Sequence, residues 1–520
     1  LKKYRRPSAA SISDGASVND VVINATISGG GAAGAITKTN IVGTLVLNGD
    51  NTYAGGTTLQ GGVLALGHKN ALGTGTLTFN TANSTLRAEG IDLTGANAIA
   101  NTWVHNTANN NVITFGGRRD VSNTFNIELS GNGTFKAPGA AERHFLQVDD
   151  NRVTATLSGI IGGGNDNLVL DKSGIGTLVL AGKNTFDMRD TALVGASTLT
   201  LGQAEGLSIS GGILRITHSN ALGTGDSQFA NINLRGDLGA VLEIDGSAGD
   251  VNVTNKHIIL FHPDNSTTRG FLNRSSTEAV HTGTLRNIAG NNSITGQIDI
   301  RNIANNGNNG TAYIGSDAGR LTLNGQIIGS RNEANTTVTN NRFIYKVGAG
   351  TVQTAGTTAN TVTGGFFVMD GTLELNKTAG VNAIAAPVGV GDDNGGPNSD
   401  RLVLLASNQI ADASVVTVRA SGQLSLATGV SALATVSTLV IGSPEQGSAN
   451  IDLGTGSALR LNNNVTVNRI AGIAASDGAS ITGAGVLELV NTAGTRTITV
   501  NDGPGESELT VSATIADGGG

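Results

Sequence analysis

The chain has 520 residues, a formal net charge of −7 and no cysteine, and 76 of its residues are glycine. The small acidic excess excludes the broad basic surface that nucleic-acid binding needs, and the lack of cysteine excludes disulfides, thiolate metal sites and cysteine nucleophiles. Glycine is about twice as frequent as in an average protein, and aromatic residues make up only 3%. This composition favours many short strands joined by many tight corners.

Residues 1–24 precede the first recognisable repeat, and residues 12–22 are apolar enough to form a strand. We predict an N-terminal arm over residues 1–24 that can add a strand to a neighbouring coil. No run of about 18 apolar residues follows anywhere in the chain, so we expect no membrane-spanning helix.

Two phrases recur along the chain. The first reads GTLVLNGDNTYAGGTTLQGGVLALGHKNALGTG at residues 43–75, and returns as GTLVLAGKNTF at 176–186, as GGILRITHSNALGTG at 211–225, and in degenerate form from Lys346. The second reads NATISGGG at residues 24–31 and returns near residues 155 and 323. These recurrences predict three modules over residues 25–154, 155–325 and 326–512, with residues 513–520 opening a further repeat.

Within each phrase, apolar residues alternate with polar ones and are bounded by Gly or Asn, which is typical of short strands. One coil of such strands cannot bury its apolar face alone, whereas stacked coils share a continuous core. The sequence therefore predicts an all-β protein, a parallel β-helix (β-solenoid). Residues 79–152 lack the repeat phrase and form either irregular coils or an inserted side domain.

The segment from Lys38 to Gly67 resembles the passenger-associated transport repeat, also called the autotransporter-associated β-strand repeat. The resemblance is dense in the first module, interrupted in the second and weak in the third. It implies a right-handed parallel β-helix in a bacterial protein that is secreted to the extracellular space or the cell surface. Adhesion, aggregation and surface coats are the roles that the resemblance implies.

The last phrase, ATIADGGG at residues 513–520, matches the phrase that opens the first module. We therefore expect subunits to stack head to tail into a surface filament, since a contact between unlike ends does not close. The alternative is a secreted passenger that acts as an adhesin and binds a surface glycan or a host or neighbouring cell. The residues expected to mediate self-assembly are Val21, Val22, Ala25 and Ile27 at one end and Val511, Ala513 and Ile515 at the other.

Two further features of the sequence are candidate binding sites. The loop from Gly391 to Asp400 offers Asp392, Asp393, Asn394 and Asp400 as oxygen ligands for calcium, although it lacks EF-hand spacing, and a solvated turn is the alternative. His68 and His218 hold equivalent places before the two Asn-Ala-Leu-Gly-Thr-Gly corners. A repeated position favours a structural role over metal binding.

Parallel β-helices include polysaccharide lyases, which makes an enzyme a remote alternative. The adjacent acids Asp149 and Asp150 would point to opposite faces of a strand, which disfavours a shared catalytic cleft. Neither a Gly-x-Ser-x-Gly nor a His-Glu-x-x-His motif occurs. We therefore predict no catalytic residues, no cofactor and no enzymatic activity, and a packing role for Trp103.

Overall fold

The computed structural model describes residues 8–10, 19–29, 34–80, 84–106, 111–116, 124–136, 142–163, 168–187, 205–224, 231–235, 239–254, 256–261, 283–301, 310–329, 342–442, 445, 447–470, 478–490, 495–502 and 507–518. The predicted N-terminal arm thus lies mostly outside the described residues. The chain divides into two compact units, residues 1–257 and 258–520. This division falls inside the predicted module of residues 155–325, and the count of three modules stays a prediction.

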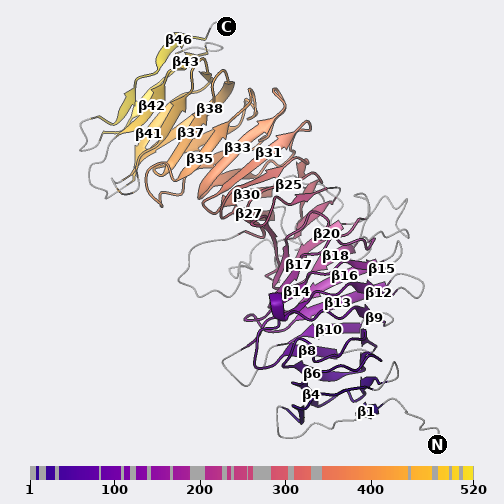
Figure 1. Cartoon of the computed structure of the whole chain (residues 1–520). Helices are drawn as coiled ribbons and strands as arrows, with labels where there is room; N and C mark the ends of the chain where they lie inside the picture. The colour runs from indigo at the N-terminus through magenta and orange to yellow at the C-terminus, as the bar shows by residue number, and fades with distance from the viewer. Residues whose placement is uncertain are drawn as a thin grey trace, which may run out of the picture. The chain divides into compact units, whose positions relative to one another are not determined.

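Unit 1 is a stack of short strands that form rows of parallel neighbours (Figure 1). The first row contains β1 (Ser8–Ala10), β3 (Ile36–Lys38), β5 (Thr57–Leu59), β7 (Leu77–Phe79), β9 (Trp103–His105), β12 (Gly133–Phe135) and β15 (Ile161–Gly163). The second contains β2 (Val21–Ile23), β4 (Thr44–Leu47), β6 (Gly62–Leu66), β8 (Ser84–Ala88), β10 (Asn111–Phe115), β13 (Glu142–Val148), β16 (Leu168–Ser173), β18 (Glu205–Ile209) and β20 (Asn231–Arg235). The third contains β11 (Ile127–Leu129), β14 (Thr154–Leu157), β17 (Thr177–Leu180), β19 (Ile213–Ile216) and β21 (Val241–Asp245). Outside these rows lie β22 (Asn252–Val253) and a 3-10 helix, η1 (Gly95–Asn97).

Unit 2 repeats this arrangement. One row contains β23 (Ile258–Phe261), β26 (Ile298–Arg301) and β29 (Ile327–Ile328). The next, which we call row C, contains β24 (Leu285–Ala289), β27 (Gly310–Ser316), β30 (Arg342–Val347), β32 (Gly365–Val368), β34 (Val388–Val390), β36 (Val415–Val418), β38 (Ser431–Ile441), β41 (Val465–Arg469) and β44 (Ile498–Val500). A third contains β25 (Asn291–Ile294), β28 (Arg320–Leu323), β31 (Thr351–Gly356), β33 (Gly371–Lys377), β35 (Asp400–Leu404), β37 (Gly422–Leu426), β39 (Asn450–Leu453), β42 (Ala479–Gly483) and β45 (Leu509–Val511). The long strand β38 also pairs with β40 (Ala458–Leu461), and β43 (Val486–Leu489) and β46 (Thr514–Asp517) follow.

The core runs through the middle of each stack, because alternate residues of each strand point inward. In unit 2 the side chains of Leu373, Leu402, Leu424, Ile451 and Ile481 lie in register on successive strands, and each is at most 4% exposed. Burial of one such side chain stabilises the fold by roughly 2 kcal/mol. Like residues stacked along the axis therefore hold successive coils together.

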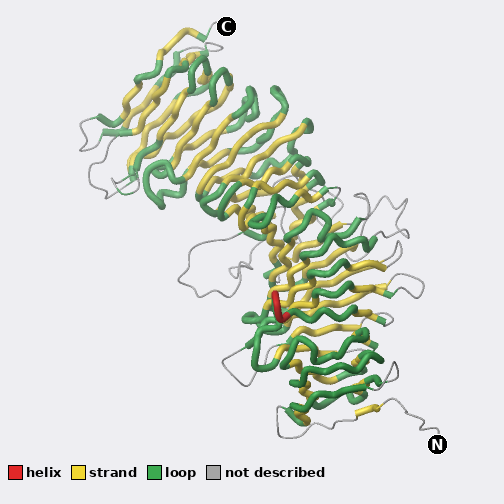
Figure 2. The backbone as a smooth tube through the Cα atoms, viewed as in Figure 1, coloured by secondary structure: helices red, strands yellow, loops and turns green. Residues whose placement is uncertain are grey.

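These observations confirm the predicted all-β parallel β-helix, in which strands and corners fill nearly all of the described chain (Figure 2). Strands β8, β10 and β13 continue the second row through residues that lack the repeat phrase. Trp103 packs in the core, as predicted: it is 2% exposed and its ring lies edge-on to Phe135, with 5.8 Å between ring centroids.

Candidate functional site

A buried lysine stands at an equivalent corner in each of the three repeat copies. Each Nζ donates hydrogen bonds to three backbone carbonyl oxygens, two on the following turn of the same coil and one on the next coil. The acceptors are Asn40 (2.6 Å), Val42 (3.0 Å) and Gly61 (3.4 Å) for Lys38; Gly174 (3.0 Å), Gly176 (2.8 Å) and Gly211 (2.7 Å) for Lys172; and Gly348, Gly350 (2.6 Å) and Asp370 (2.5 Å) for Lys346. An ammonium has three donors, so this geometry uses all of them.

The residue after the third acceptor is a glycine with positive φ in every copy: Gly62 (68°), Gly212 (60°) and Gly371 (64°). A Cβ atom on Gly62 would lie 2.6 Å from Nζ of Lys38, and one on Gly371 would lie 2.5 Å from Nζ of Lys346. Glycine is therefore required both by the backbone conformation and by the space that the ammonium occupies. We call each such arrangement a lysine corner.

Burial changes the acidity of these lysines. The side chains of Lys38, Lys172 and Lys346 are at most 1% exposed. Desolvation lowers the pKa of Lys172 to about 7, against the opposing effect of Asp171, and lowers the pKa of Lys346 to about 7, against Asp370, Asp400 and Asp317. The pKa of Lys38 is also lowered by burial, which Asp20 opposes.

A buried asparagine follows each lysine corner and joins three successive coils. Its Oδ1 accepts a hydrogen bond from a backbone N–H of the preceding coil, and its Nδ2 donates one to a backbone carbonyl of the next coil. The partners are Ile27 (2.7 Å) and Ala71 (2.6 Å) for Asn51, Ile161 (2.9 Å) and Ala221 (2.7 Å) for Asn184, and Ile327 (2.8 Å) and Ala383 (2.8 Å) for Asn360. The pattern of the sequence showed the recurring Lys and Asn but not these contacts.

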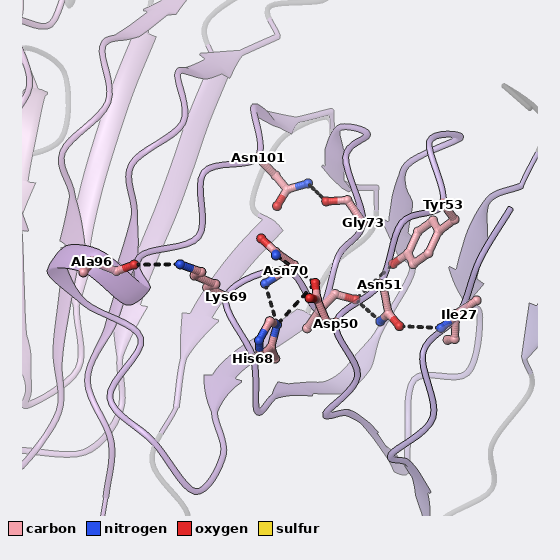
Figure 3. A network of polar contacts seen from close by, with 11 residues as sticks. Ile27, Asp50, Asn51, Tyr53, His68, Lys69, Asn70, Gly73, Ala96 and Asn101 are labelled. Atoms are coloured by element: carbon pink, nitrogen blue, oxygen red, sulfur yellow. Dashed lines mark hydrogen bonds and ion pairs between the residues drawn. The ribbon is translucent and has the colours of Figure 1, made fainter.

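Figure 3 shows the first of these asparagine bridges with the polar contacts beside it. His68 Nδ1 accepts a hydrogen bond from the backbone N–H of Asn70 at 3.1 Å, and His218 accepts the same bond from Asn220 at 3.0 Å. The repeated histidine therefore has the same structural contact in both copies. Asp50 completes the first corner, since it accepts a hydrogen bond from Asn70 Nδ2 at 2.8 Å.

Two histidines that are 39 residues apart meet inside unit 1. Nδ1 of His105 and Nδ1 of His144 lie 2.6 Å apart, both rings are 1% exposed, and Phe135 packs against both. Burial lowers the pKa of His105 to about 3, with a further contribution from His144, and lowers the pKa of His144 to about 4. One neutral ring thus donates to the other. Sequence reasoning missed this pair because the two residues come from strands in different rows.

The predicted calcium loop has its carboxylates engaged by the protein. Asp393, at φ 66°, pairs with the Arg419 guanidinium and accepts a hydrogen bond from the backbone N–H of Ala420 at 3.0 Å. Asp392 Oδ1 accepts one from the backbone N–H of Asn394 at 2.9 Å. These contacts favour a turn held by the protein's own groups over a calcium site, whereas the alternative given by the sequence was a solvated turn.

The fourth candidate ligand, Asp400, is 1% exposed and accepts a hydrogen bond from Ser421 Oγ at 2.5 Å. Burial raises the pKa of Asp400 to about 6, and it also raises the pKa of Asp392. Within the described ranges no three or more His, Cys, Asp or Glu side chains gather in a way that could hold a metal ion. Calcium binding at this loop stays a prediction.

The residues expected to mediate self-assembly lie on strands or corners of the first and last described coils. Val21 and Val22 in β2 are 38% and 46% exposed, and β2 pairs with β4 of its own chain; Ala25 is exposed and Ile27 is half-buried in the corner that follows. Val511 in β45 is half-buried, Ala513 is buried, and Ile515 in β46 is 56% exposed. The two groups belong to different compact units, and self-assembly through them stays a prediction.

Comparison with known proteins identifies the repeat. The family model of the passenger-associated-transport-repeat matches residues 36–66 and 170–187, which contain the first two lysine corners' lysines and the first two asparagine bridges. The chain is also similar to the adhesin BmaC autotransporter of Brucella suis biovar 1 (strain 1330), with 25% identity over 316 residues. That match covers 58% of this chain and 8% of the relative, so the chain spans a small part of it. No solved structure matches the chain.

Both comparisons place the chain among secreted proteins of the bacterial cell surface, as the sequence predicted. None of the described segments forms a helix with the length and apolar character needed to span a membrane. The chain carries passenger-associated transport repeats, built around lysine corners and asparagine bridges, in a parallel β-helix of the autotransporter passenger type.

Proposed function

We propose that the chain is an adhesive passenger segment, a non-enzymatic β-helix that presents its outer faces to a target surface. The observation that carries this proposal is the similarity to an adhesin autotransporter over 316 residues, together with two matches to the passenger-associated repeat. This supports the adhesin alternative better than the head-to-tail filament.

The geometry of the stack supports the same role. Parallel strands repeat at about 4.8 Å along each row, so outward side chains form long columns on a rigid scaffold. Polar corners fasten the coils from inside, as Lys346 and Asn360 do in unit 2. Many weak contacts on such a surface add through multivalency.

Asp150, one of the two adjacent acids considered for glycoside hydrolysis, is engaged by the protein itself. Asp150 forms a two-point contact with Arg152, from Nε to Oδ1 at 3.0 Å and from NH2 to Oδ2 at 2.7 Å. This ion pair closes a tight corner, which supports a structural role for Asp150. An assay for release of unsaturated sugars from acidic polysaccharides tests the remote lyase alternative.

The adhesive role is tested with the purified 520-residue chain coupled to fluorescent beads. We expect saturable binding of the beads to cultured host cells or to immobilised matrix proteins, and competition by the free chain. Beads that bind no better than albumin-coated beads on every surface would overturn the proposal. Light scattering on the same preparation tests the filament prediction, because head-to-tail assembly would raise the mass far above that of the monomer of 52.3 kDa.

A further inference from the structure

One column of side chains on the outer face of row C in unit 2 is uncharged along its whole length. The residues lie in register on successive strands: Tyr313, Tyr345, Phe367, Gly389, Thr417, Thr438, Thr466 and Thr499. The neighbouring positions on two of these strands, Ile344 and Phe366, are 4% and 1% exposed and pack in the core. Alternation therefore directs this aromatic–threonine column outward.

The aromatic end of the column is a stack of rings. Ring centroids lie 5.0 Å apart for Tyr313 and Tyr345 and 5.1 Å apart for Tyr345 and Phe367, with planes tilted by 20° and 22°. Phe343 lies beside them, 6.3 Å from Phe367. Tyr313 is buried, whereas Phe343, Tyr345 and Phe367 are half-buried. The whole chain has only 17 aromatic residues (12 Phe, 4 Tyr and 1 Trp), so a cluster with three partly exposed rings concentrates a scarce residue type.

Gly389 lets the last ring lie close to the sheet. A Cβ atom at Gly389 would stand 2.7 Å from Cδ1 of Phe367, so any other residue would push the ring away. Beyond the glycine, the column continues as four threonines, of which Thr417, Thr438 and Thr466 are half-buried and Thr499 is exposed. Their hydroxyl groups recur at about 4.8 Å, and each can donate and accept hydrogen bonds.

We infer that the aromatic–threonine column binds an uncharged polysaccharide that lies along the stack. A sugar ring offers apolar C–H groups, which pack against the outward edges of the stacked aromatic rings, and hydroxyl groups, which pair with threonine hydroxyls. A polysaccharide repeats along its length, as the column does, so successive sugars meet successive rungs and weak contacts add. The column supplies no cation, which disfavours acidic polysaccharides and nucleic acids. This inference rests on the proposed adhesive function and names its ligand class.

The test uses the full chain and three kinds of probe: an array of uncharged oligosaccharides, particles of amorphous cellulose and of chitin, and heparin as the acidic comparison. The column variant is Thr438→Glu with Thr466→Glu, which places two charges opposite each other on β38 and β41. The matched control is Thr58→Glu with Thr78→Glu, two half-buried threonines that are likewise opposite each other on β5 and β7 of unit 1. Circular dichroism melts verify that both variants fold.

We expect the wild-type chain and the control to bind at least one uncharged glycan, and the column variant to bind it at least tenfold more weakly. The inference is overturned if the wild type binds only heparin or no glycan, or if both variants bind alike. Pelleting is also measured without any added glycan. If the wild-type chain pellets there and the column variant does not, the column is an interface between copies of the chain, and this result also overturns the inference. If beads that carry the column variant bind host cells as well as beads that carry the wild type, the inference is refuted and the adhesive role is left intact.

Discussion

The Nζ atom of Lys172 lies 2.7 Å from the backbone carbonyl oxygen of Gly211, a residue 39 positions further along the chain. The same contact spans 23 positions in the first copy and 24 in the third. Coils of different length are thus connected by the same lysine corner. The lysine corner therefore accommodates coils with different numbers of residues while the strands keep their register.

Replacing Lys172 with methionine removes the donor to three carbonyl oxygens and keeps a side chain of similar length. Because the carbonyl oxygens of Gly174 and Gly176 then lose their hydrogen-bond donor, we expect the free energy of local unfolding to fall by about 2 kcal/mol. Hydrogen exchange read by mass spectrometry should show faster exchange in β18 and β19. The control is Lys183→Met at an exposed position in the same corner region. Equal protection in both variants would contradict the role of the lysine corner.

Replacing Asn360 with alanine breaks the bridge between three coils of unit 2. The buried N–H of Ile327 and the carbonyl of Ala383 lose their side-chain partners, for which we expect about 2 kcal/mol of destabilisation. Urea unfolding of the full chain, monitored by hydrogen exchange at β29, measures this destabilisation. Asn376→Ala on the exposed face of β33 is the control and should unfold like the wild type.

The buried lysines predict that the folded chain becomes more stable as the pH rises above about 7. The pKa values of Lys172 and Lys346 are about 7 in the folded chain, against 10.5 for an ordinary exposed lysine. Between these values the unfolded chain binds more protons than the folded chain, so the free energy of unfolding rises with pH from about 7 towards 10. Urea midpoints at pH 7.5 and 9.5 should differ in this direction for the wild type. A Lys172→Met, Lys346→Met variant with the same pH slope would refute the assignment.

Asp400 predicts the opposite pH dependence of stability at lower pH. Its folded pKa is about 6 and its ordinary value is 3.8, so between these values the folded chain holds the proton more tightly and stability falls as pH rises. The loss attributable to this group is roughly 3 kcal/mol at most. Asp400→Asn keeps an acceptor for Ser421 Oγ and should abolish the fall. We expect the variant to be more stable than the wild type at pH 7 in urea unfolding.

The buried histidine pair predicts acid sensitivity. Folded pKa values of about 3 for His105 and about 4 for His144 lie below the ordinary 6.5, so the pair's contribution is complete above pH 6.5 and is lost as pH falls. The measurement is the shift of the urea midpoint between pH 7 and pH 4.5. A His105→Leu, His144→Leu variant should show a smaller shift, and an equal shift would contradict the assignment.

The strand architecture was predictable because its causes are local. Alternating apolar residues such as Leu373 and Leu375 dictate a half-buried strand, and positive-φ glycines such as Gly371 dictate the corner before it. Recurrence of the same phrase then leaves stacking as the way to bury the apolar face. The recurring Lys and Asn were visible in the same phrases, since their distance from the GTLVL strand changes little between copies.

The contacts that these residues make were decided only by the tertiary structure. The number of residues per coil varies, so spacing along the chain does not tell which carbonyl of the next coil reaches Lys172 or which ring meets His105. The aromatic–threonine column has the same origin, because Tyr345, Phe367 and Thr417 become neighbours only through the register of parallel strands. The sequence by itself determined that each coil consists of short strands joined by glycine corners. The stacking of coils decided which side chains meet in a lysine corner, in the core or on an outer face.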